Sequence, residues 1–313
     1  MIEVYLGDEE SRRYVQTYLG NIRQLYPSEL FTLPKVITLE EATREITGLI
    51  DGKLFWELVN TATNILRAEY SSEFGILNPK RYYYGIPEST SAVGGFHSKW
   101  SVGYHQLYHA GFVVMLNPAV VTDIRVRTAE AVRAYLHDCL HYSTFHSYRR
   151  VVLIPKVAAE AKYCEPRVYR EQYGFNFRNS EGLSYSDRSL TALVPQAINL
   201  NLLMDGIVVN VAASLIKRQL KLTGLTDFDN GIFHEVIGEP FEVPGYRHAQ
   251  KFFDAVPKPS QVFIEHWGGD EFLKVAFTAM MTGEVAPLKH YFNLKHGEEG
   301  AWEKVFMRPE FRL

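Results

Sequence analysis

Two histidines separated by three residues, His137 and His141, are the side chains of this sequence best suited to bind a metal ion. In a helix of about 3.6 residues per turn, positions four apart lie on one face, so both imidazoles can bind the same ion through ring nitrogens. Asp138 follows the first histidine and would then lie beside the metal. The alternative is that both histidines are ordinary core or surface residues, since a His-x-x-x-His pair also occurs by chance.

The segment before this motif favours the helix that the two histidines need. Thr128 has the side chain of an N-cap, and residues 129–136 after it are mostly good helix formers. Leu136 and Leu140 supply an apolar stripe along the same helix. A helix that is apolar and also carries two histidines is expected to be buried at an active site.

The composition indicates a folded chain without a nucleic-acid surface. The 313 residues include 33 basic and 36 acidic side chains, so the formal net charge is -3. This balance argues against a basic nucleic-acid-binding face. Hydrophobic residues at 46% and aromatic residues at 13% argue against disorder.

Cysteine usage and the absence of long apolar runs indicate the compartment. The two cysteines are Cys139, inside the expected metal helix, and Cys164, so a disulfide framework is not expected. The first ten residues have no basic region, and no uninterrupted apolar run approaches the roughly 20 residues of a membrane helix. We therefore expect a cytoplasmic protein with no signal peptide and no membrane or nucleic-acid partner.

Pattern changes along the chain divide it into three parts, residues 1–90, 91–220 and 221–313. We expect a mainly helical first part, a second part with the strands and the metal helix, and a helical third part. Predicted helices, besides the metal helix, cover residues 39–49 behind a capping box of Thr38 and Glu41, 53–70, and 190–220. Predicted strands cover residues 110–116, 150–155 and 167–178, the last two as a possible hairpin, and residues 78–95 predict a linker or long loop.

This order of elements resembles the zincin metallopeptidases, most of all their glutamate-ligand branch. In that family the motif is H-E-x-x-H, and the third zinc ligand is an acid on a later helix, often in a run like L-N-E-G-x-x-E. Residues 203–207, Leu-Met-Asp-Gly-Ile, are similar to that run and place Asp205 64 residues after His141. Residues 268–277 also resemble the C-terminal helices of some bacterial members.

The resemblance implies an α+β fold, with a zincin-like catalytic unit between helical N-terminal and C-terminal parts. It implies zinc bound by His137, His141 and Asp205, and peptide-bond hydrolysis on a peptide or protein substrate with Asp138 as the catalytic base. We expect the strand at residues 111–116 to pair with an extended substrate. Glu181, which precedes a glycine, is the alternative third metal ligand.

The sequence departs from this family at both glutamates, which are aspartates here. Asp138 is one methylene shorter than the family base, and a displacement of about 1 Å can cost on the order of a hundredfold in rate. Asp205 raises less difficulty, because aspartate and glutamate oxygens bind zinc at the same distance. The resemblance therefore supports the fold and the metal better than the activity.

Two other functions fit the same residues. The His137-Asp138 doublet also occurs in HD-type metal-dependent phosphohydrolases, where His97 and Asp205 would be further metal ligands. Against that class, the chain carries β-like patterning, and Arg149-Arg150 is the extent of the basic residues near the motif. A catalytically dead zincin-like binding or structural protein is the third hypothesis, motivated by the short Asp138.

The remaining histidines do not form a second obvious metal site. His105 and His109 lie in a strand-like stretch, where their spacing separates them by about 13 Å. His146 misses by one residue the spacing of a three-histidine motif. Candidate oxyanion donors, among which the sequence does not select, are His234, His248, Tyr185 and Tyr246.

Overall fold

The structure is a computed structural model, and it describes most of the chain in separate ranges. These are residues 2–24, 36–70, 74–86, 93–102, 105–119, 122–152, 166–180, 183–185, 188, 200–222 and 269–306. Helices and mixed sheets are both present, which confirms the α+β class. Within the described residues, no helix has the length and apolar character needed to cross a membrane.

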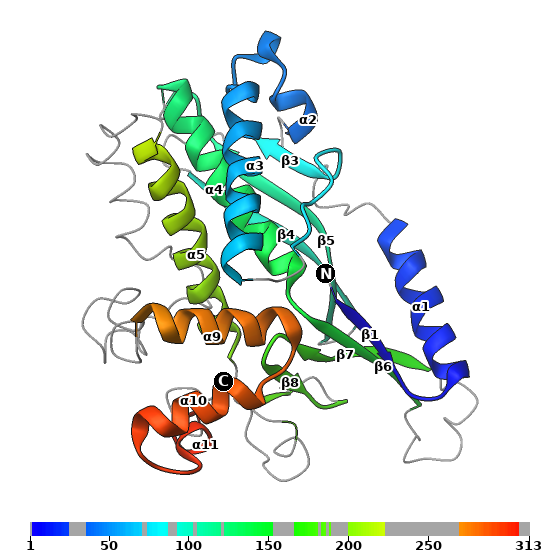
Figure 1. The fold of residues 1–313 in the computed structure, drawn as a ribbon. Coiled ribbons are helices and arrows are strands. Elements are labelled where there is room, and N and C mark those ends of the chain that lie inside the picture. The colour runs from blue at the N-terminus through cyan, green and yellow to red at the C-terminus, as the bar shows by residue number, and fades with distance from the viewer. Residues whose placement is uncertain are drawn as a thin grey trace.

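The strands form two sheets (Figure 1). The five-stranded sheet has the order β1 (Glu3–Leu6), β6 (His146–Val151), β7 (Arg167–Tyr173), β8 (Asn176–Arg178) and β9 (Ser184–Tyr185). In this sheet β1 and β6 are parallel, and the other neighbours are antiparallel. The four-stranded sheet has the order β2 (Val36–Thr38), β3 (Tyr82–Gly85), β5 (His105–Leu116) and β4 (Val93–Val102), with β3 and β5 parallel.

Three long helices, α3 (Gly52–Tyr70), α4 (Ile124–Ser143) and α5 (Asn201–Leu222), pack side by side (Figure 1). Helix α9 (Gly269–Thr282) contacts α3 and α5, and α10 (Ala286–His296) and α11 (Ala301–Phe306) follow it. One large apolar core joins these helices to the sheets. Helix α1 (Glu9–Gln24) packs on β6 around a smaller core.

The helix that carries the histidines begins one turn earlier than predicted. Its N-cap is Asp123, whose carboxylate accepts a hydrogen bond from the backbone N–H of Arg125. Thr128 lies inside the helix, where its hydroxyl donates to the Ile124 carbonyl and accepts from the backbone N–H of Asp51. The prediction of Thr128 as N-cap was therefore wrong, because this threonine bonds to α3's N-terminal segment instead.

Several other predictions need correction. The capping box of Thr38 and Glu41 is present, but the helix behind it ends at Ala42 and is followed by a 3-10 turn over Glu45–Thr47. Residues 1–90 contribute β1, β2 and β3, and β3 lies inside the predicted linker. The predicted strand 167–178 folds back on itself as β7 and β8, with Gly174 at positive φ in the turn.

The predicted substrate strand is not available for pairing. Residues Phe112–Met115 of β5 pair with β3 on one side, and the whole strand pairs with β4 on the other. Because both rows of backbone groups of residues 112–115 are already bonded, an extended substrate cannot add to β5 there. Among the described strands of this sheet, the edges are β2 and β4.

Candidate metal centre

The two histidines share one face of α4, as their spacing predicts. The ring centroids of His137 and His141 lie 4.6 Å apart, with an angle of 69° between the ring planes. His141 is buried and His137 is half-buried. Two imidazoles this close can supply two nitrogen ligands to one ion.

Tyr173, at the end of β7, holds one of these rings. Its hydroxyl lies 2.8 Å from Nδ1 of His141, and both side chains are buried. With Nδ1–H donating to this hydroxyl oxygen, Nε2 carries the lone pair that a metal requires. Hydrogen bonds of this kind fix the tautomer and ring orientation of metal-binding histidines.

Asp138 lies about 60° around the helix from His141. It is 5% exposed, and its Oδ2 accepts a hydrogen bond of 2.8 Å from the Tyr82 hydroxyl of β3. Burial, followed by the charge of Asp138, raises the pKa of Tyr82 well above its usual value. The phenol therefore stays protonated and holds the carboxylate, so that Tyr82 acts as a positioning residue for Asp138.

Cys139 does not belong to the candidate metal centre. Its side chain is fully buried, and its Sγ accepts a hydrogen bond of 3.3 Å from the backbone N–H of Leu77. Burial raises the pKa of this thiol above its usual range. The residue is a neutral thiol here, and it lies about 160° around the helix from both histidines.

The third ligand is not assigned by the structure. Asp205 lies in the first turns of α5, and α5 packs against α4. His97 lies in β4, opposite Phe112. Glu181, His234, Tyr246 and His248 lie outside the described residues. Within the described ranges, no group of three or more His, Cys, Asp or Glu side chains is arranged to hold a metal.

Two buried arginines lie near Tyr173, the residue that bonds to His141, and sequence reasoning missed them. Arg170 of β7 and Arg178 of β8 are 2% and 7% exposed. The Arg170 Cζ lies 4.1 Å from the centroid of the Tyr173 ring, whose hydroxyl reaches His141. Burial lowers the pKa of both guanidinium groups, and repulsion from Arg170 also helps to lower the pKa of Arg178, to about 9.

A β-bulge places Arg170 and Tyr173 together. The register moves from Tyr148 opposite Arg170 to Ser147 opposite Gln172, so Glu171 is the extra residue. In a regular strand, residues three apart point to opposite faces, and the bulge removes that alternation. Because the bulge breaks the period-two alternation of a regular strand, the residue pattern of the sequence does not predict that Arg170 and Tyr173 lie together.

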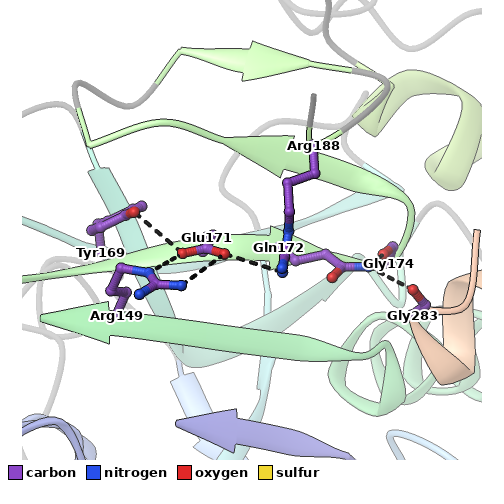
Figure 2. Close-up of polar contacts among 7 residues, drawn as sticks. All are labelled: Arg149, Tyr169, Glu171, Gln172, Gly174, Arg188 and Gly283. Carbon is purple, nitrogen blue, oxygen red and sulfur yellow. Dashed lines mark hydrogen bonds and ion pairs between the residues drawn. The ribbon is translucent and has the colours of Figure 1, made fainter. Parts of the chain in front are cut away.

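The carboxylate of Glu171 is committed to other arginines (Figure 2). It forms ion pairs with Arg149 of β6 and with Arg188, the latter at 3.1 Å, and accepts a hydrogen bond from the Tyr169 hydroxyl. The neighbouring Gln172 donates to the carbonyls of Gly174 and Gly283, which ties β7 to the end of α9. Glu171 therefore has strong partners that do not include Arg170.

Comparisons of the chain with protein-family models, with curated proteins and with solved structures found no match.

Proposed function

We propose that the chain is a zinc-dependent hydrolase, with His137 and His141 as metal ligands and Asp205 as the third. The observation that carries the proposal is the hydrogen bond between the Tyr173 hydroxyl and Nδ1 of His141. A buried hydroxyl in this position orients the ring, and when Nδ1–H donates to it the lone pair is on Nε2. An i, i+4 histidine pair with one ring so ordered suits a metal centre better than a packing role.

Peptide-bond hydrolysis is the reaction that we propose first. A bound zinc ion would supply polarisation of the scissile carbonyl and activation of a water molecule. Asp138 would accept the proton and return it to the leaving amine, with its carboxylate held by Tyr82. An extended peptide would add to the edge strand β4, because residues 112–115 of β5 are already paired on both sides.

Phosphate-ester hydrolysis is the second candidate, and Arg170 and Arg178 favour it. These two cations lie in the same buried cluster as Tyr173 and His141. With these two residues, the basic side chains near the motif are no longer limited to Arg149 and Arg150. The chemistry of the HD class, with His97 as a further ligand, is then consistent with the charge of the site.

Metal content and two activity assays test these alternatives. His137→Ala and His141→Ala should each abolish stoichiometric zinc, measured by elemental analysis of the purified protein. His97→Ala should keep zinc in a peptidase and lose it in an HD-type enzyme. Wild-type zinc in both His137 and His141 variants would refute the metal centre itself.

The activity assays use an unstructured protein and a phosphodiester as substrates of the zinc-loaded protein. Cleavage of the protein alone would support the peptidase, and cleavage of the phosphodiester alone would support the second candidate. Bound zinc with no cleavage of either substrate would indicate a zincin-like binding or structural protein.

A further inference from the structure

We propose that Arg170 and Arg178 form a binding site for a phosphate group in the protein interior, beside Tyr173. The inference rests on the arginine pair and not on the metal, so it applies to the zinc-free protein as well. If the proposed hydrolase function holds, the phosphate belongs to its substrate or to a ligand that binds next to its histidines.

The buried charges of Arg170 and Arg178 are the first reason to expect a bound anion. Both guanidinium groups are more than nine-tenths buried, on the adjacent strands β7 and β8, and repulsion from Arg170 helps to lower the pKa of Arg178. The Nε atom of each has no hydrogen-bond partner in the part of the chain that the structure describes. Buried charges are normally paired, because removing an ion from water is costly. An anion between the two side chains would supply the missing partner.

The charge and the donor geometry of the two guanidinium groups indicate which anion binds. Glu171, the carboxylate next to Arg170 in the chain, is engaged by Arg149 and Arg188. Two guanidinium groups carry two positive charges, and a phosphate group near neutral pH carries about 1.5 to 2 negative charges. The forked donors of arginine also match pairs of phosphate oxygens. A carboxylate, with one charge, would balance only half of the pair.

Aromatic contacts hold the Arg170 side chain in place. The Tyr173 ring packs against Arg170, with its centroid 4.1 Å from Cζ, and the centroid of the His146 ring lies 5.0 Å from that of Tyr173. The His146 ring in turn stacks on Tyr148, at 5.9 Å and 6°. These aromatic contacts, built on adjacent strands β6 and β7, restrict the guanidinium of Arg170 before any ligand arrives. Preorganisation of this kind lowers the entropic cost of binding.

Isothermal titration with inorganic phosphate tests the proposal on the full chain, in chloride buffer with EDTA to remove zinc. The wild type should bind one phosphate per chain, and Arg170→Gln and Arg178→Gln should each weaken binding about 10- to 100-fold, the effect of losing hydrogen bonds to a charged group. Arg149→Gln is the matched control, since this arginine is paired with Glu171, and it should bind phosphate as the wild type does.

A second measurement guards against variants that fail to fold. Arg178→Lys keeps the positive charge but loses the forked guanidinium donors, so it should weaken phosphate binding. Its unfolding temperature should stay close to that of the wild type. Without phosphate, Arg178→Gln should unfold at the same or a higher temperature, since it removes an unbalanced buried charge. The proposal would be overturned if Arg178→Gln unfolded at a much lower temperature than the wild type and the wild type bound no phosphate. That result would show that a carboxylate of the chain itself balances the charge of Arg170 and Arg178.

Two further arms distinguish the ligand. Adenosine monophosphate binding more tightly than inorganic phosphate would identify a phosphate ester as the ligand, and weaker binding would identify the free ion. A blocked dipeptide with a free C-terminal carboxylate that binds in place of phosphate would overturn the assignment. Because EDTA is present throughout, failure here leaves the zinc hypothesis untouched, and loss of zinc leaves this result untouched.

Discussion

Tyr173→Phe is the most informative single change, because it removes one hydroxyl and retains the ring. The ring contacts with Arg170 and His146 depend on carbon atoms and remain in the variant. What is lost is the 2.8 Å hydrogen bond to Nδ1 of His141. The change therefore isolates the role of the hydroxyl in ordering the histidine.

Two magnitudes are expected for this loss. Removing the partner of a buried polar group costs about 1 to 3 kcal/mol of unfolding free energy, and here Nδ1 of His141 loses its hydrogen-bond partner. Removing a hydrogen bond that orients a metal ligand typically lowers metal affinity about 10- to 100-fold. That decrease corresponds to about 1.4 to 2.7 kcal/mol of zinc binding free energy.

Zinc competition with a chromophoric chelator measures the affinity, and urea unfolding of the zinc-free protein measures the stability. Tyr84→Phe is the matched control, because Tyr84 is fully buried and its hydroxyl donates to the Leu116 carbonyl at 2.9 Å in the four-stranded sheet. The control should lose stability of similar size and keep the wild-type zinc affinity. Equal zinc affinity in Tyr173→Phe and the wild type would refute the argument that the hydroxyl orients a metal ligand.

The other predictions concern the acids and the buried thiol. Asp138→Asn should keep zinc and abolish cleavage, whereas cleavage by Asp138→Glu and none by the wild type would show that the native carboxylate falls short of the reacting water. Asp205→Ala should weaken zinc binding at least tenfold and Glu181→Ala should not, and the reverse result would move the third ligand. Burial raises the pKa of Cys139, so in a Cys164→Ser background a thiol reagent at pH 8 should label the protein only after unfolding, and rapid labelling of the native protein would contradict the packing around α4.

Local interactions explain what the sequence predicted correctly. Helix α3 matches the prediction for residues 53–70, and β5 contains the predicted strand 110–116. The capping box at Thr38 depends on residues three apart, and the close approach of His137 and His141 depends on residues four apart. Each of these features is decided within one or two turns of chain, so residue type and spacing determine it.

Only the tertiary structure decided how the histidine face is supported. Tyr173 reaches His141 from a strand 32 positions away, and Tyr82 reaches Asp138 from 56 positions away. The bulge that brings Arg170 and Tyr173 together forms where β7 pairs with β6, a strand about 20 positions earlier in the chain. Likewise, the hydroxyl of Thr128, inside the helix that Asp123 caps, accepts from the backbone N–H of Asp51, 77 positions away. These partners meet because sheets and helices bring distant segments together, and no local pattern of residue types encodes that meeting.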